Sequence, residues 1–548
     1  MTALGPFFES YYRLRPVNAT FTGIHQHDDR LPDWSPDALA AAADEMRSLR
    51  ASLAAVPTDA TSLRDLALRD RALAISFLDV QIAESESPHF QRGNPSLALG
   101  EAVFGIVSLI TRPFAPAAQR AGSLEARLGA LPGFLDGARR SIVHGVPDQW
   151  RAKCLHECDG AARLLRDGVA RWLAIESLDG ESVLRACEKA SQAVADYRQW
   201  LTSDVPAAPA ARISVGPELF DLLMDRGHHC ARSSASLAGD VSDKLDETLA
   251  ELDRRARLAA PGGYAEIQAR LADAHPGVAD YLATYQQIWD DCRTASSRAD
   301  LVTWPASPIR YVPIPPQTRD AAPFLYYLFY RSPAPFDRLP VHDYVVTPVD
   351  EDMAPEEQQR RLRAANTSVI KLNHVVHHGA IGHHVQNYHA YRGASEIGRV
   401  AAVDCASRIG MFLGGTMAEG WACYATDLMD EIGFLTPDES LAQLQTRARL
   451  LARAVVDLGL HTGALTFDEA VGVYRDRVGM SAEAARGEVC KNSMFPATAI
   501  MYWLGTDGLH RLRRARERAD ATSFSLRRFH DRLLSFGSIP VALLEGIW

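Results

Sequence analysis

The sequence predicts an all-α protein, because helical periodicity, helix-start signals and the scarcity of alternating strand patterns all indicate that fold class. From Val241 onward, Leu245, Leu249, Leu252 and Ala256 recur at steps of four, three and four. Charged residues occupy the other face of this segment. The spacing is typical of an amphipathic helix that buries one apolar stripe.

A second amphipathic helix is predicted over Leu441–His461, and a capping box marks its start. Thr436 supplies the N-cap hydroxyl, Pro437 fits the first helical position, and Glu439 can bond back to the cap. A similar capping box at residues 466–469 opens another helix. Because helical signals continue along most of the chain, we expect one large helical domain over residues 1–548.

A proline-rich segment from Val302 to Pro348 interrupts the helical pattern with ten prolines and several aromatic residues. Each proline fixes its φ angle and lacks a backbone donor, so we expect an extended loop here. Asp343–Thr347 is the candidate strand of a short hairpin. The segment separates an N-terminal helical part, residues 1–300, from a C-terminal part, residues 301–548.

Composition and charge argue against several classes of protein. The net charge of −10 and the pI near 6.0 disfavour a nucleic-acid partner and an anionic membrane surface, since both attract basic patches. The N-terminus lacks a basic region followed by an apolar one, and no apolar run reaches the about 18 residues of a membrane span. We therefore expect a cytoplasmic protein with neither nucleic acid nor membrane as a partner.

Eight cysteines are sparse for this length, and none forms a C-x-x-C pair. Cys154 and Cys158 lie four residues apart, a spacing that resembles half of a metal site. No partner pair follows at a suitable distance, so we interpret both as core or helix-surface thiols.

The histidines are strongly clustered, since six of the 18 lie between Asn373 and His389. Neutral imidazole is the commonest protein ligand for metal ions, so the cluster indicates a metal site. In one ligand set, His377 and His383 flank a glycine-containing turn, and a later glutamate completes the site. In the other, His374 and His378 share a helix face, and His384 or His389 is the third ligand. The spacing leaves both sets open.

Glu419 is an acidic residue among small and apolar neighbours, from Met417 to Ala422. A carboxylate in such surroundings is costly unless it is paired or coordinated. Metal ligation explains it, and a buried ion pair, for example with Arg408, is the alternative.

Two segments resemble the bacterial family called domain of unknown function 885, which is similar to helical zincin-type metallopeptidases. Residues 377–386, HHGAIGHHVQ, resemble its motif H-E-x-x-P-G-H-H-x-Q, and residues 419–426, EGWACYAT, resemble E-G-W-A-x-Y-A-E. Further matches extend over most of the chain, at residues 16–33, 322–327, 457–461, 488–489, 496–505, 529–530 and 537–540.

This resemblance implies a large helical zincin-like fold, of the gluzincin or carboxypeptidase-like kind, with a central cleft. It also implies a divalent metal held by His377, His383 and Glu419. Zinc is the metal expected first, and the histidine excess would also suit iron or copper.

The departures from the family motif concern chemistry. The motif's glutamate, the general base of a zincin, is His378, and its proline is Ile381. The second glutamate of the other motif is Thr426. Thr498 stands where the family has glutamine, and Lys491-Asn492 replaces an Arg-Tyr pair. Loss of a general base typically costs about 10²–10⁴ in rate. His378 could shuttle protons in its place or become a fourth ligand.

Further candidates complete the predicted site. Tyr502 and Tyr326 could stabilise an oxyanion or orient the substrate, with core aromatics as the alternative. His384 and His461 are candidates for substrate binding, and a structural pair with Asp457 is the alternative for His461.

Three functions remain open from the sequence. The first is a metal-dependent hydrolase of an amide or a small peptide-like substrate. The second is a metalloenzyme that tailors a small metabolite by a lyase, cyclase or redox step. The third is a binding protein that kept the fold and lost turnover.

Overall fold

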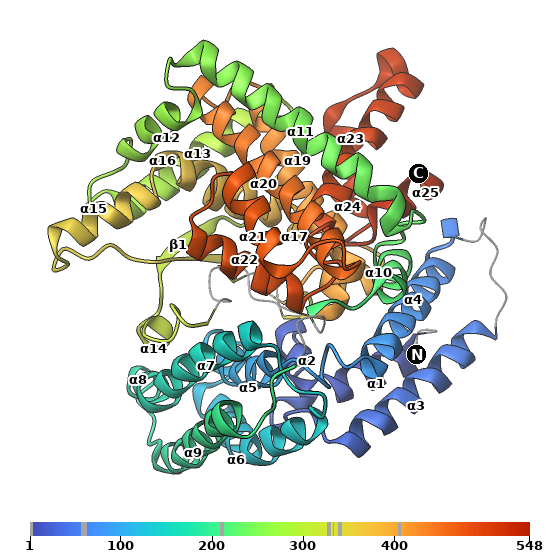
Figure 1. Ribbon diagram of the computed structural model, residues 1–548, viewed down its shortest axis with the longest axis vertical. Coiled ribbons are helices and arrows are strands. Elements are labelled where there is room, and N and C mark those ends of the chain that lie inside the picture. Colours follow the sequence, from blue (N-terminus) through green and yellow to red (C-terminus); the bar gives the residue numbers. More distant parts are fainter. Residues whose placement is uncertain are drawn as a thin grey trace.

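The computed structural model is mostly helical, which confirms the predicted fold class (Figure 1). It describes residues 4–55, 63–208, 213–325, 330–331, 334–337, 342–403 and 407–548. Within these ranges the only sheet is a small three-stranded one.

The described residues of the N-terminal part begin with nine α-helices. They are α1 (Gly5–Leu14), α2 (Pro16–Thr22), α3 (Pro36–Ala54), α4 (Leu66–Glu86), α5 (Pro95–Ile110), α6 (Ala117–Ser141), α7 (Asp148–Arg163), α8 (Val169–Ile175) and α9 (Glu181–Ser203). Four more follow before the proline-rich segment: α10 (Pro217–Leu222), α11 (Ser234–Ala259), α12 (Tyr264–Asp273) and α13 (Tyr281–Arg298).

The C-terminal part carries the remaining α-helices. They are α14 (Pro316–Arg319), α15 (Pro355–Ala364), α16 (Thr367–Val369), α17 (His383–Ala390), α18 (Glu396–Val400), α19 (Gly415–Glu431), α20 (Pro437–His461), α21 (Phe467–Gly472), α22 (Ala482–Met494), α23 (Met501–Asp520), α24 (Leu526–Ser535) and α25 (Leu544–Ile547).

Short helices of other pitch adjoin these elements. The π-helices are η3 (Leu164–Gly168), η5 (Leu223–Gly227), η6 (Ile370–Gly379), η7 (Gly410–Gly414) and η8 (Val473–Arg477). The 3₁₀-helices are η1 (His25–His27), η9 (Ala521–Ser523) and η10 (Val541–Leu543).

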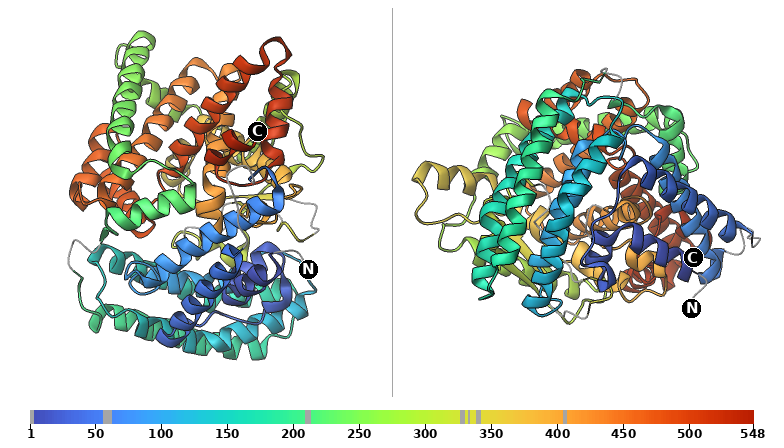
Figure 2. Two further views of the ribbon diagram at one scale, coloured as in Figure 1. Left: turned by 90° about the vertical axis from the view of Figure 1, so that its right-hand side faces the viewer. Right: turned by 90° about the horizontal axis from the view of Figure 1, so that it is seen from below.

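The helices form two tiers that share their cores. Figures 1 and 2 show α5–α9 together as one tier and most of the later helices as the other. One large core combines residues of α5–α9 with residues of α20–α22, and the other combines residues of α1 and α4 with residues of α13, α19 and α23. Burial of both cores therefore requires the N-terminal and C-terminal parts together.

The sequence signals are found where expected. Both predicted capping boxes are present, at the starts of α20 and α21. The predicted stripe lies on α11, where Leu245 and Ala256 are fully buried. Cys154 and Cys158 are buried in the core, as we interpreted them.

The proline-rich segment forms the sheet in the order β1-β3-β2, from β1 (Ile309–Pro313), β2 (Tyr330–Arg331) and β3 (His342–Val346). β2 and β3 pair antiparallel, which confirms the hairpin and shifts its predicted strand by one residue. The parallel pairing of β1 with β3 was not predicted, and it places Tyr311 beside Tyr344.

Helices α19 and α23 cross at two glycines. A Cβ atom on Gly420 would lie 2.6 Å from the Cα atom of Gly505, and one on Gly505 would overlap the carbonyl oxygen of Thr416. Only glycine fits at such an approach of two backbones. The crossing brings Glu419 of α19 and the first turn of α23 to the same region.

We expect Gly505→Ala to lower the free energy of unfolding by about 3 kcal/mol, because the added methyl group cannot fit between the two backbones. The control is Gly129→Ala in α6, where a Cβ atom meets nothing within 4 Å. This control should stabilise the protein by about 0.5–1 kcal/mol. Urea unfolding midpoints test both, and similar shifts in the two variants would contradict the crossing.

Candidate metal centre

Three histidines converge where η6 ends and α17 begins. The ligand atoms of His377, His378 and His383 all lie within 4.8 Å of one another. His377 and His378 are consecutive residues near the end of the π-helix η6, and both imidazoles nevertheless face this group. Their ring centroids are 4.6 Å apart.

The turn between the histidines is held by two buried tryptophans. Trp421 donates its indole N–H to the carbonyl of Ile381 at 2.8 Å, and Trp289 donates to the carbonyl of Gly379 at 2.7 Å. A Cβ atom on Gly382 would overlap the carbonyl oxygen of His377. The glycine and the indoles thus fix how His377 approaches His383.

Glu419 of α19 lies beside two of these histidines. Its Oε2 atom lies 3.4 Å from Nε2 of His377 and 3.6 Å from Nε2 of His383. This buried oxygen accepts no hydrogen bond from any residue that the structure describes. Two ligand atoms at about 2.0–2.1 Å from a tetrahedral ion lie about 3.4 Å apart, so these separations suit a divalent cation between the three groups.

Electrostatics favour the forms that bind a metal. Burial lowers the pKa of His377, and burial together with the charges of His377 and His383 lowers the pKa of His378 well below its usual value. Burial alone would raise the pKa of Glu419, but His383 and His377 hold it well below its usual value. Neutral imidazoles and an ionised carboxylate are the states that ligation requires.

The centre is not sealed from solvent. The side chains of His377, His383 and Glu419 keep 15%, 11% and 20% of their surface exposed. Part of each of these three side chains is therefore in contact with solvent.

The orientation of His378 is fixed by the backbone. Its Nδ1 atom lies 2.7 Å from the carbonyl oxygen of Asn373, and a carbonyl only accepts, so Nδ1 carries the proton. In the neutral ring, the lone pair is then on Nε2.

The ion-pair alternative for Glu419 is not formed with Arg408. Arg408 donates its Nε–H to Glu84 at 2.8 Å instead. The groups that face Oε2 of Glu419 are His377 and His383, at 3.4 and 3.6 Å.

The second ligand set is not assembled, because the ligand atoms of His374 and His389 do not join that of His378 in one group. Nδ1 of His374 lies 2.9 Å from the hydroxyl of Tyr285, and Nε2 of His389 lies 2.9 Å from the carbonyl of Thr303. Within the described part of the chain, His377, His378 and His383 form the only group of this kind.

The predicted substrate-binding histidines are fully buried and bonded to the backbone. Nε2 of His384 lies 3.1 Å from the carbonyl of Ser307, and Nε2 of His461 lies 3.0 Å from that of Asn492. His461 also lies 3.7 Å from the carboxylate of Asp457. Their roles in substrate binding stay predictions, and no exposed surface supports them.

Tyr502 lies in the first turn of α23 and is partly exposed. The guanidinium of Arg453 sits 5.3 Å from the centre of its ring, and the charge of Arg453 contributes to the lowered pKa of His377. Tyr502 is thus near a group that acts on the centre. Tyr326 lies outside the described residues.

An aromatic wall beside the histidines was missed by the sequence analysis. Tyr344 of β3 has its ring centroid 5.8 Å from that of His378 and 5.7 Å from that of His374. Its register partner Tyr311 lies next to it, and Tyr285 lies against Tyr311. The aromatic residues of the proline-rich segment were the feature of the sequence that could have indicated these contacts.

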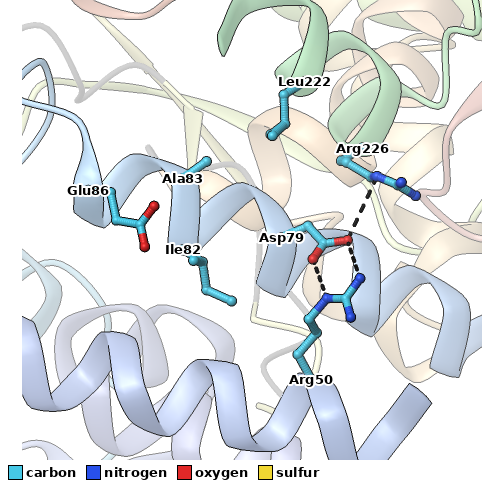
Figure 3. Close-up of a pocket in the computed structure, with 7 residues that line it drawn as sticks. All are labelled: Arg50, Asp79, Ile82, Ala83, Glu86, Leu222 and Arg226. Carbon is cyan, nitrogen blue, oxygen red and sulfur yellow. Dashed lines mark hydrogen bonds and ion pairs between the residues drawn. The ribbon is translucent and has the colours of Figure 1, made fainter. Parts of the chain in front are cut away.

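A separate surface pocket of about 330 Å³ lies between α3, α4 and the segment of α10 and η5 (Figure 3). Asp79 in this pocket pairs with Arg50 at 2.5 Å and lies 3.7 Å from Arg226. Asp79 and the two arginines thus neutralise one another's charge. None of the predicted site residues lines this pocket.

The comparisons with known proteins agree with this picture of the fold. A family model described as "Bacterial protein of unknown function (DUF885)" matches residues 16–547. A putative lipoprotein of unknown function from Shewanella oneidensis matches with a TM-score of 0.76 and 19% identity, covering 98% of this chain and 97% of that one. A putative lipoprotein from Colwellia psychrerythraea matches with a TM-score of 0.71 and 18% identity, covering 98% and 96%. No curated protein matches.

The prediction of a cytoplasmic location is contradicted by these matches. Both solved structures are described as putative lipoproteins. The prediction relied on the lack of leader features near the N-terminus, which is weak evidence. No helix in the described ranges is long and apolar enough to span a membrane.

We expect zinc to raise the melting temperature of the protein, and Glu419→Gln to remove most of this effect. At a concentration of about 1,000 Kd a ligand adds about 4 kcal/mol, and a hundredfold weaker Kd removes about 2.7 kcal/mol of it. The control is Glu431→Gln at the end of the same helix, where the carboxylate pairs with Arg513 at 2.8 Å. Equal zinc effects in both variants and the wild type would contradict a ligand role for Glu419.

Proposed function

We propose, since this chain belongs to the bacterial family of unknown function DUF885, that it is a metal-dependent enzyme which hydrolyses an amide or peptide-like bond in a small substrate. The observation that carries the proposal is the buried Oε2 atom of Glu419. It has no hydrogen-bond donor among the described residues and lies between two imidazole nitrogens at ligand-to-ligand distances.

The ligand arrangement also supports a zincin-like relationship. Two histidines lie on either side of one tight turn, and a glutamate comes from a later helix, as the family motif implies. The indole of Trp421 links the two motifs, because it follows Glu419 and bonds to the turn between the histidines.

The residues around the centre have distinct roles in this proposal. His377 and His383 would hold the ion through neutral nitrogens, and Glu419 would supply negative charge. A divalent ion, zinc in the first place, would act as a Lewis acid. Tyr502 would donate a hydrogen bond to a substrate oxygen, with Tyr326 as a further candidate. His378 occupies the place of the general base.

The histidine at position 378 also favours a second function. His378 is not a carboxylate, and its Nδ1–H is already committed to the carbonyl of Asn373. A centre rich in imidazole and without a carboxylate base suits the tailoring of a small metabolite by a lyase, cyclase or redox reaction, with iron or copper as the ion. A binding protein without turnover is the remaining alternative.

The two enzymatic functions are separated by His378→Glu, which restores the motif's glutamate. Amine release from a mixture of dipeptides and N-acyl amino acids is measured by mass spectrometry for the wild type and the variant. We expect the wild type to cleave one class of amide and the variant to change its rate. Cleavage by the variant alone, and not by a His378→Gln control, would contradict the hydrolase and favour the second function.

A further inference from the structure

We propose that His378 is itself a ligand, so that the ion is held by three imidazoles and one carboxylate. The inference rests on the proposed metal centre but not on which reaction takes place there. It goes beyond the three ligands that the family motif implies, because the motif has a glutamate at this position.

The positions of the rings support this donor set. The centroids of His377 and His383 are 4.9 Å apart, and that of His378 lies 4.6 Å from the first and 5.4 Å from the second. One ligand atom from each ring lies within 4.8 Å of the other two. The three imidazoles therefore surround a common point, and Glu419 approaches the same two neighbours of His378.

The hydrogen bond of His378 supports ligation rather than base catalysis. Metal-binding histidines commonly donate their second ring N–H to a backbone carbonyl or a carboxylate, which fixes the tautomer and aims the free nitrogen. The bond from Nδ1 to the carbonyl of Asn373 has this form. It leaves Nε2 as the ring's available donor atom for a cation.

The surroundings hold the imidazole in place. The ring of Tyr344 flanks His378, and Tyr344 is only 4% exposed.

The test is to count the imidazoles on a copper ion added to the purified protein. Electron spin-echo envelope modulation detects the remote nitrogen of each coordinated imidazole. We expect three coordinated imidazoles in the wild type and two in His378→Gln. The Kd for Zn²⁺ should rise at least about 10–100-fold in this variant, because loss of a group that only hydrogen-bonds to a ligand already weakens binding by that factor. The control is His374→Gln in the same π-helix, where Nδ1 contacts Tyr285, and it should keep three.

The outcomes separate this inference from the metal centre itself. Two imidazoles in the wild type, with count and Kd unchanged in His378→Gln, would overturn the ligand role and leave the His377, His383 and Glu419 centre intact. Failure of the wild type to bind either Cu²⁺ or Zn²⁺ would overturn both. If His378→Gln does not fold, the wild-type count decides alone, since three supports the inference and two contradicts it.

Discussion

Two indole N–H groups hold the turn between His377 and His383, and the geometry of the whole centre depends on them. Trp421 and Trp289 satisfy carbonyls of this buried turn, which would otherwise be costly to leave unpaired. Trp421 also follows Glu419 on α19. The same turn of α19 therefore supplies the carboxylate and positions the imidazoles. The contact of Gly420 with Gly505 fixes how closely α19 packs against α23.

The balance of charge in the centre follows from this rigidity. Burial lowers the pKa of His377 beside Glu419, and Arg408, the arginine considered as a partner of Glu419, is bonded to Glu84 instead. An ionised, partly buried carboxylate without a permanent cation is costly, and a bound divalent ion removes that cost. In the proposed zincin-like site, His378 at the position of the motif's glutamate would leave one negative charge where a typical zincin has two.

Much of the fold and part of the site could be predicted from the sequence. Capping boxes and apolar spacing depend on local interactions, so the helices at residues 241–256 and 441–461 were predictable. The candidate ligands followed from motifs. The π-helical form of η6, with the hydrogen bond that His378 donates to the carbonyl of Asn373, and the position of Tyr344 depend on the packed structure, which spacing does not encode. Spacing alone could not choose between the two ligand sets for the same reason.

The central claim is that this chain carries a metal ion at His377, His383 and Glu419. Elemental mass spectrometry of the purified protein, beside a His377→Ala variant that keeps its helical circular dichroism, tests it most directly. The account predicts about one divalent ion per chain in the wild type and a large loss in the variant. No metal in the wild type, even after incubation with zinc, iron and copper salts, would contradict it.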